Sequence, residues 1–348
     1  MNFKSIDEWV KDYGTSLDII SKPAQTSYPL PNTIYNVQDL FSNILIDNFR
    51  KMSSRLFNAQ ITDVYVNTGR VMNKNYEIND FKDCNETAYV TFYNTSINLK
   101  NGIHLASHWG GINYWHWMVS SLSRLSLLNN IPKDVTYIVN SLDNNFVSGS
   151  LKAMGIDPSQ CIEIDRVGCV HCDNLILPSL MTDYNQRGLL FLRNKLRKPS
   201  TNTPSRIYIS RRNSRIVENE EEVMDLLKTY GFELIRCEDL SFEDQVKTFS
   251  NAEVVISPHG AGLTNLLFVK DNAKVLELRS PHYFGKCYYY LSNHLGLKYY
   301  SLYGEGELPK TKEEASAGLY SNMRINIDRL QQTLDFMGVE RNKEQTSS

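Results

Sequence analysis

The chain has 348 residues, a length that suits two domains of ordinary size. Lysine and arginine total 37 and aspartate and glutamate total 39, so the formal net charge of -2 gives no electrostatic reason to expect a nucleic-acid partner. Hydrophobic residues make up 41% and charged residues 22%, which excludes wholesale disorder. No apolar run reaches the roughly 18 residues that a spanning helix requires, and the mixed, charged start carries no secretory signal. We therefore expect a soluble, cytoplasmic protein.

The first hundred residues carry few signals of secondary structure. A proline-punctuated stretch at 26–36 predicts an extended segment, and alternating side chains over Ala88–Leu99 predict a strand. The next stretch, Gly102–Trp117, is rich in aromatic residues and histidine. It leads into apolar residues at helical spacing, namely Met118, Leu122, Leu125 and Leu128.

Strands and helices then alternate, which favours a parallel α/β layer. The predicted strands are Val135–Asn140, Cys161–Asp165 and Asn174–Pro178, and the predicted helices are Asn145–Ile156 and Asn185–Arg197. We assign residues 1–197 to a first, Rossmann-like domain. A linker rich in proline, serine, threonine and asparagine follows at 198–205.

The second half repeats this alternation more clearly, with steps of the length typical of Rossmann-like units. The predicted strands are Arg206–Arg212, Phe232–Cys237, Ala252–Pro258 and Ala273–Ser280, and the predicted helices are Glu218–Gly231, Leu240–Asn251 and Ala261–Val269. Residues 198–318 thus form a second Rossmann-like domain that ends in a charged loop, Glu313–Gly318. We expect residues 319–340 to hold a final helix, Tyr320–Met337, that packs back on the first domain, and residues 341–348 to be a disordered tail.

The six cysteines do not make a disulfide framework in a chain of this length. Three stand alone in the sequence: Cys84, Cys237 and Cys287. The others cluster with a histidine: Cys161, Cys169, His171 and Cys172. Such a cluster could bind zinc, but it lacks a second separated pair of cysteines. We interpret it as buried thiols around a short strand and predict no metal site.

The stretch Val254–Phe268 is the most informative for function. An apolar strand ends at Ser257-Pro258 and is followed by His259-Gly260-Ala261-Gly262 and then a helix. Glycines let a ligand approach the backbone, and the start of a helix offers free N–H groups, so this turn suits a pyrophosphate. The alternative is a tight turn that binds nothing. The stretch is not a dinucleotide fingerprint, because Asn265 replaces the third glycine.

Charged residues of the second half also lie toward this edge of the sheet, in the loop after the first strand and within a later strand. Arg211, Arg212 and Arg215 follow the first strand of that domain, and arginine binds phosphate through a bidentate fork. Arg211 and Arg212 come directly after the strand, so we expect them to point inward. Glu277 lies within an otherwise apolar strand, where its carboxylate needs a partner such as a ribose diol or a buried arginine.

In the first half, histidines lie close together in the aromatic stretch. They are His104, His108 and His116, the last at a helix entry among Tyr114, Trp115 and Trp117. Imidazole is a natural general base near neutral pH, and aromatic faces suit sugar rings or nucleobases. The same residues are equally good components of a core.

Taken together, three segments resemble glycosyltransferase family 61, which includes capsular-polysaccharide members. The segments are Asn113–Leu125, Tyr208–Val269 and Lys274–Pro281, and the resemblance covers Gly110–Leu302. It implies the GT-B architecture, in which two Rossmann-like domains face each other across a cleft. It also implies an inverting, metal-independent transfer from a nucleotide-sugar donor, UDP-linked by family expectation, with no cofactor.

The resemblance also implies roles for individual residues. Arg211 and the turn Gly260–Ala261–Gly262 would bind the diphosphate with help from His259, and Glu277 would hold the ribose. Asn113 and His116 match the Asn-Tyr-x-His-Trp motif of the family's first domain and would face the donor sugar. The candidate donor-binding set is completed by Arg212, Arg215 and Asn265.

The mechanism that we expect is a single displacement in which His116 deprotonates an acceptor hydroxyl and Arg211 stabilises the leaving diphosphate. The expected acceptor is a saccharide, lipid-linked or free, in the synthesis of a surface glycan. Peripheral contact with the inner face of a membrane through Tyr288–Tyr290 and a homodimer are left open. The alternatives are a nucleotide-sugar epimerase on the same fold and a non-catalytic carbohydrate-binding protein.

Overall fold

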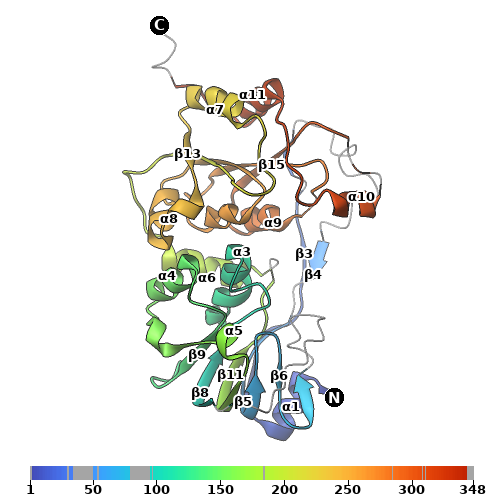
Figure 1. The fold of residues 1–348 in the computed structure, drawn as a ribbon, viewed down its shortest axis with the longest axis vertical. Coiled ribbons are helices and arrows are strands. Elements are labelled where there is room, and N and C mark those ends of the chain that lie inside the picture. The colour runs from blue at the N-terminus through green and yellow to red at the C-terminus, as the bar shows by residue number, and fades with distance from the viewer. Residues whose placement is uncertain are drawn as a thin grey trace. The chain divides into compact units, whose positions relative to one another are not determined.

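The computed structural model describes residues 2–29, 31–33, 50–52, 55–78, 95, 97–182, 185–283, 285–307, 309 and 311–342. The chain divides into two compact units, and Figure 1 labels many of their elements. Unit 1 comprises Met1–Gln25 and Met52–Leu196, and unit 2 comprises Thr26–Lys51 and Arg197–Ser348. Both units combine helices with sheets, so the predicted α/β class is confirmed.

In its described residues, unit 1 is built on a mixed sheet of nine strands. Their order is β1 (Asn2–Lys4), β7 (Tyr76–Ile78), β6 (Val71–Met72), β5 (Leu56–Val66), β11 (Val170–Pro178), β8 (Asn98–His104), β9 (Thr136–Val139) and β10 (Cys161–Glu163), with β2 (Gly14–Ser21) paired to β5. The strands β11, β8, β9 and β10 are parallel, whereas β5 is antiparallel to β11, β2 and β6. The predicted Rossmann-like character therefore describes only one half of this sheet.

The helices of unit 1 follow local signals that are readable in the sequence. They are α1 (Ile6–Tyr13), α3 (Tyr114–His116), α4 (Asn145–Ala153), α5 (Ile164–Val167) and α6 (Gln186–Leu196), with a short 3-10 helix at Pro158–Gln160. Ser5 and Glu8 form a reciprocal capping box that starts α1, and Ile6 and Trp9 bury its apolar side. The predicted helix after Trp117 continues α3 as a π-helical turn, Trp117–Ser121, and a 3-10 helix, Leu122–Leu127.

In the described part of unit 2, five parallel strands form one sheet. Their order is β13 (Glu233–Ile235), β12 (Arg206–Ile209), β14 (Val254–Pro258), β15 (Lys274–Arg279) and β16 (Lys298–Tyr303). Counted within the unit this is 2-1-3-4-5, a doubly wound order. The helices are α7 (Glu220–Thr229), α8 (Phe242–Phe249), α9 (Cys287–His294), α10 (Lys312–Ala317) and α11 (Ile327–Phe336), with 3-10 helices at Cys237–Asp239 and Ala261–Leu267.

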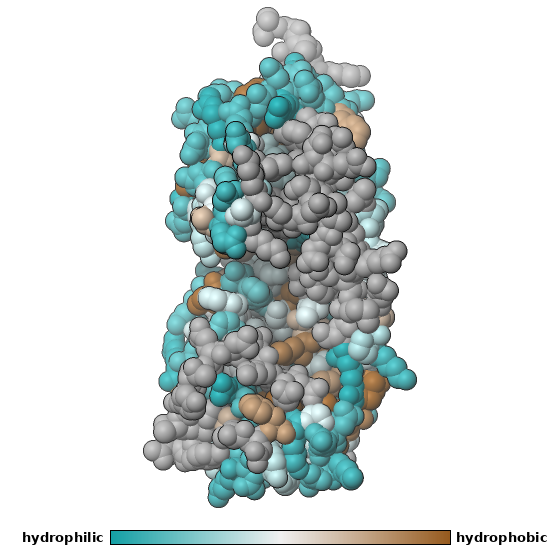
Figure 2. Space-filling model, turned by 90° about the vertical axis from the view of Figure 1, so that its right-hand side faces the viewer, coloured by the Kyte–Doolittle hydropathy of each residue, from teal (hydrophilic) through white to brown (hydrophobic). Residues whose placement is uncertain are grey.

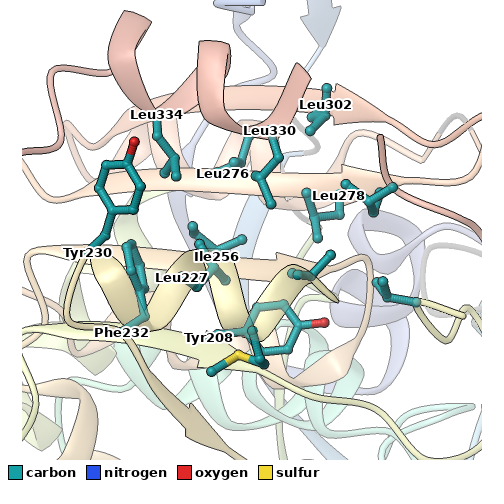
Figure 3. Packing of buried hydrophobic residues seen from close by; sticks show 14 of the residues in the cluster. Tyr208, Leu227, Tyr230, Phe232, Ile256, Leu276, Leu278, Leu302, Leu330 and Leu334 are labelled. Atoms are coloured by element: carbon teal, nitrogen blue, oxygen red, sulfur yellow. The ribbon is translucent and has the colours of Figure 1, made fainter. Parts of the chain in front are cut away.

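The core of unit 2 explains the position of its last helix (Figure 3). Leu330 and Leu334 of α11 are fully buried in one cluster with Leu227 of α7 and the strand residues Ile256 and Leu276. The predicted packing of residues 319–340 on the first domain is therefore wrong. The helix is also shorter than predicted, because Asn326 caps its start by accepting from the Arg329 N–H.

Other predictions near the C-terminus have mixed outcomes. The predicted charged loop Glu313–Gly318 is instead mostly helix α10, capped by Thr311. Most of the predicted strand Ala88–Leu99 and of the tail 341–348 lies outside the described residues, as does Cys84.

A short N-terminal segment belongs to unit 2. The Tyr28 ring packs 4.7 Å from the ring of Tyr290, and its hydroxyl hydrogen-bonds to His294 Nε2 at 3.0 Å. Asn32 bridges to Tyr300 of β16, and its amide donates to the Tyr299 carbonyl at 3.0 Å. Beside this segment, β3 (Gln25–Ser27) and β4 (Arg50–Met52) form a two-stranded sheet.

Within the described residues, no helix is both long and apolar enough to cross a bilayer. On the face drawn in Figure 2, most of the coloured surface is hydrophilic, and hydrophobic residues lie in small separate groups. Tyr288, Tyr289 and Tyr290 are each only 2% exposed. They are core residues of unit 2 and are not exposed on its surface.

Candidate functional site

The strand order of unit 2 singles out one position on its sheet. The strand β12 lies between β13 and β14, so the chain leaves β12 on one side and returns on the other. Ligands of such parallel sheets bind outside the carboxyl ends of the two strands at this reversal. The loops that follow these ends are Ser210–Arg215 after β12 and His259–Gly262 after β14. They are the two loops that the sequence analysis singled out.

Arg211 links these two loops. Its Nε donates to the carbonyl of Ser214 at 2.8 Å, and its Nη1 donates to the carbonyl of His259 at 3.1 Å. Among the described residues, no carboxylate forms an ion pair with this half-buried guanidinium. Burial and the nearby Arg215 lower the pKa of Arg211 from its very high ordinary value. The sequence prediction that Arg211 points inward is confirmed.

Glycine at position 260 is required by the approach of that arginine. The Gly260 backbone is extended, with φ of 172°, so its conformation would suit other residues. A Cβ here would lie only 1.3 Å from Nη1 of Arg211. Gly262 is close-packed as well, since its Cβ would lie 3.1 Å from Ile209 Cγ2. The Arg211 guanidinium thus packs directly against the backbone of Gly260.

The segment after the turn differs from the prediction. Residues Ala261–Leu267 form a 3-10 helix of seven residues. The dipole of a full α-helix, which the sequence analysis invoked for phosphate binding, therefore contributes little here. The positive charge at this edge comes from arginine side chains.

Arg212 and Arg215 take different directions. Arg212 forms a bidentate ion pair with Asp239, at 2.7 and 2.6 Å, and half of its side chain is exposed. The prediction that it points inward is wrong. Arg215 has φ of 55°, and its guanidinium lies over the rings of Tyr283 and Tyr320, at 5.1 and 5.5 Å from their centroids. Like Arg211, it forms no ion pair within the described residues.

His259 and Glu277 form a buried hydrogen-bonded pair. The Nδ1 of His259 bonds to Oε1 of Glu277, and Oε2 of the same carboxylate accepts from the Tyr299 hydroxyl. Arg279 Nη1 lies 3.8 Å from Oε2. Of the two partners that the sequence suggested for Glu277, the structure supplies the buried arginine. The carboxylate is fully enclosed, so the expected contact with a ribose does not fit this arrangement.

Arg279 and Tyr283 complete the surroundings of this pair and were missed in the sequence. Arg279 donates to the carbonyls of Tyr283 and Gly285, at 3.1 and 2.6 Å. The Tyr283 ring covers the His259 ring, with centroids 3.9 Å apart and planes 34° apart. A signal was present, because Arg279 lies two residues after Glu277 on the same face of one strand.

Asn265 has a structural role. It is fully buried, and its amide donates to Gln245 Oε1 at 2.8 Å and to the carbonyl of Gly262 at 3.1 Å. It therefore joins α8 to the turn instead of facing a ligand. Its predicted contact with the donor does not fit this burial.

In unit 1, the histidine motif lies at the carboxyl edge of the parallel strands. Asn113 caps α3, because its Oδ1 accepts from the backbone N–H groups of Trp115 and His116, at 3.0 and 3.4 Å. His116 is half-buried on α3. A Cβ on Gly110 would lie 2.4 Å from Asn140 Oδ1, so glycine is required by close packing here too.

The polar groups beneath Gly110 satisfy one another. Asn140 Oδ1 accepts from the Ser107 N–H at 3.0 Å, and its amide donates to Asp165 at 3.2 Å. The hydroxyls of Ser107 and Ser121 are hydrogen-bonded at 2.7 Å. Apart from Asp165 at its edge, the side chains of this network beneath the motif are uncharged.

The first histidine of the aromatic stretch is a core residue. His104 is fully buried; its Nε2 bonds to the Asn67 carbonyl at 2.9 Å and its Nδ1 lies 3.4 Å from Arg124 Nη1. Burial, reinforced by the charge of Arg124, lowers the pKa of His104 to about 3. His104 is therefore neutral and has no access to a ligand.

Similarity to known proteins agrees with this geometry. Residues 114–276 match the family Glycosyltransferase 61. Over this segment the chain is similar to glycosyltransferase family 61. The resemblance inferred from the sequence is thereby confirmed, and the family 61 segment contains Arg211, Gly260 and His116.

Several curated proteins resemble part of the chain. The EGF domain-specific O-linked N-acetylglucosamine transferase of Mus musculus is 37% identical over 90 residues, 24% of this chain and 17% of that protein. The Drosophila melanogaster protein of the same name is 35% identical over 99 residues, 26% of this chain and 18% of its own length. The beta-1,2-xylosyltransferase of Arabidopsis thaliana is 30% identical over 103 residues, 26% and 19% of the two chains. The chain thus matches less than a fifth of the length of each relative.

Metal-binding groups do not gather around the family 61 segment. Across the described residues, no three histidine, cysteine, aspartate or glutamate side chains are grouped so as to hold a metal ion. Cys169 and Cys172 are buried thiols, and burial raises their pKa values to about 11 and about 12. His171 hydrogen-bonds to Asp63 at 2.8 Å instead of joining the thiols.

Proposed function

We propose that the chain is a glycosyltransferase that moves a sugar from a nucleotide-sugar donor to a hydroxyl of a saccharide acceptor. The observation that carries the proposal is the guanidinium of Arg211, which packs against Gly260 at the strand reversal of a parallel sheet and forms no ion pair with a carboxylate of the described residues. The family 61 match and the similar curated proteins, which are named as sugar transferases, support this class of reaction.

The charge balance of this edge suits a diphosphate. Arg211 and Arg215 lack carboxylate partners among the described residues, whereas the adjacent Arg212 is neutralised by Asp239. A nucleoside diphosphate carries the complementary charge and accepts the paired N–H bonds that a guanidinium offers. As the sugar leaves, negative charge builds up on the diphosphate, and a pre-positioned arginine stabilises it without a metal ion.

The finer features of the reaction belong to the same proposal. They are a UDP-linked donor, inversion at the anomeric carbon, independence of metal, the GT-B arrangement and a role in surface-glycan synthesis. His116 is the proposed general base, because it is a half-exposed imidazole on the family motif at the strand edge of unit 1.

A nucleotide screen tests the donor site. Calorimetry would measure binding of UDP, GDP, CMP, ADP and TDP to the full chain, with and without EDTA. We expect one nucleoside diphosphate to bind in the presence of EDTA, and Arg211→Gln to weaken it roughly 30-fold or more, the worth of charge-assisted hydrogen bonds. Arg212→Gln is the matched control, since the neighbouring side chain is already paired with Asp239.

The outcomes separate the alternatives. Failure of every nucleotide to bind would overturn the donor site. Equal losses in Arg211→Gln and Arg212→Gln would show that only the net charge matters. Turnover of the matching nucleotide sugar without any acceptor, giving an isomeric nucleotide sugar, would instead identify an epimerase.

A further inference from the structure

The buried pair His259–Glu277 has one nitrogen that the protein leaves available. The Nδ1 of His259 is held by Glu277, and no described residue hydrogen-bonds to its Nε2. The side chain of His259 is 7% exposed, so the ring is not fully enclosed, whereas the Glu277 carboxylate is. The imidazole therefore presents Nε2 at the same turn whose backbone carbonyl, that of His259, accepts a hydrogen bond from Arg211.

The charge state of Glu277 fixes which nitrogen of the ring carries the proton. Burial acts against its charge, but Arg279, His259 and Tyr299 outweigh burial and hold its pKa below the ordinary value. An ionised carboxylate only accepts hydrogen bonds, so the His259 proton is on Nδ1. Burial also lowers the pKa of His259, although Glu277 opposes this effect. The ring is then neutral, and Nε2 carries a lone pair.

A lone pair on Nε2 conflicts with a phosphate oxygen, which also has only lone pairs to offer. Contact between the two requires a proton between them. The imidazolium that results would be stabilised by the Glu277 carboxylate on one side and by the anionic ligand on the other.

We propose that Glu277 is a positioning residue for His259, and that a nucleoside diphosphate binds together with one proton, taken up from solvent at His259 Nε2. The inference rests on the proposed donor site and adds how that site recognises its anion. A proton-linked contact would tighten binding of the diphosphate product as pH falls.

The groups that face His259 come from several elements and act in opposite directions. They are Glu277 and Arg279 of β15, Tyr283 after β15, Tyr288 of α9, Tyr299 of β16 beyond the carboxylate, and Arg211 and Arg215 after β12. The arginines oppose protonation in the free protein, and a bound diphosphate would offset them. The pKa of His259 therefore rises on binding.

Calorimetry at several pH values tests this proton linkage. The probe is UDP, or whichever of GDP, ADP and TDP binds in the screen, titrated into the full chain in two buffers of different ionisation enthalpy. We expect uptake of close to one proton above that of the ligand's own phosphate titration, and an affinity that falls up to tenfold per pH unit on raising the pH. His259→Gln should abolish the extra uptake and flatten the pH profile.

Glu277→Gln separates positioning from folding. Its amide can still accept from Nδ1–H but carries no charge, so the imidazolium loses its support and we expect the uptake to fall well below one proton. Tyr299→Phe, which removes only one hydrogen bond to the carboxylate, is the milder second variant and should reduce the uptake partially. His171→Gln is the matched control, because it removes a histidine paired with a carboxylate, Asp63, in unit 1.

The result also distinguishes this inference from the proposed function. Binding with no extra proton uptake, and with the same pH profile in wild type and His259→Gln, would overturn the proton linkage while leaving the donor site intact. Nε2 would then accept a hydrogen bond from a ligand hydroxyl. No binding in any variant at any pH would overturn both.

Discussion

In each unit a glycine packs closely against polar side chains at the carboxyl edge of the parallel strands, but the groups around the two glycines differ in charge. In unit 1, Gly110 lies on Asn140 within a network whose hydrogen bonds are satisfied internally. In unit 2, Gly260 lies on Arg211, whose charge has no carboxylate partner in the described residues. The first arrangement stabilises a loop, and the second leaves binding capacity for an anion. Close packing of glycine alone does not tell the two apart.

The largest expected effect comes from Gly260→Ala. The new Cβ would overlap the end of the Arg211 side chain, which is flexible and can move away, so the fold should survive while the guanidinium is displaced. We expect nucleoside diphosphate affinity to fall roughly 30-fold, as in Arg211→Gln, because the same charge-assisted hydrogen bonds are lost. Calorimetry with UDP, paired with a melting curve, measures both quantities. Unchanged affinity would mean that the position of Arg211 is irrelevant to the ligand.

Gly110→Ala should show the opposite pattern. Its Cβ would meet short side chains, Asn140 and Ser107, that are fixed by hydrogen bonds and cannot swing away. We expect a loss of about 1–3 kcal/mol in the free energy of unfolding, typical of overpacking, with nucleotide affinity retained. Urea unfolding followed by circular dichroism gives the first value. A loss of binding at full stability would contradict the distinction between the two glycines.

The buried histidine of unit 1 predicts a pH effect on stability. In the folded chain His104 has a pKa of about 3, against roughly 6.5 when unfolded, so the unfolded state binds more protons between these values. Stability should therefore fall as pH drops below 6.5, by at most about 1.4 kcal/mol per pH unit. Urea midpoints at pH 7 and pH 5.5 measure this, and His104→Gln should lessen the difference. An equal difference in the variant would assign the effect to other groups.

The smallest effect should come from Arg212→Gln. Its ion pair with Asp239 is half-exposed and screened by water, so we expect the free energy of unfolding to stay close to that of wild type. Nucleotide affinity should stay within roughly twofold of wild type, since the charge is already paired. A larger loss of affinity would show that Arg212 leaves Asp239 when the ligand binds.

The two loops of the candidate site in unit 2 could be predicted from the sequence because their signals are local. The strands β12, β14 and β15 are apolar runs followed by marked loops, and the residues after a strand end must lie at the same edge as those after its parallel neighbour. Position alone could not separate Arg211 from Arg212. Arg211 is oriented by the His259 carbonyl, 48 residues away in the chain, and Arg212 by Asp239, 27 residues away.

The rest of the fold depended on partners far apart in sequence. In the strand β5 apolar and polar residues alternate over 57–62, but Asp63, with a φ of 54°, interrupts the alternation, so the full length of the strand could not be predicted. A buried arginine was correctly considered as a partner of Glu277. The hydrogen bond between Glu277 and His259 could not be predicted, because it joins neighbouring strands whose order in the sheet must be known first. The last helix carries an apolar face that fits either unit, and only its contact with α7 decides between them.

The segment around Tyr28 has a consequence for synthesis on the ribosome. Its partners Tyr290 and His294 are made more than 250 residues later, so the segment must remain undocked while the intervening chain emerges. During that interval it is available to chaperones or to wrong partners. A chain cut before residue 288 would leave it without its native contacts, and unit 2 expressed from residue 197 onward would lack it altogether.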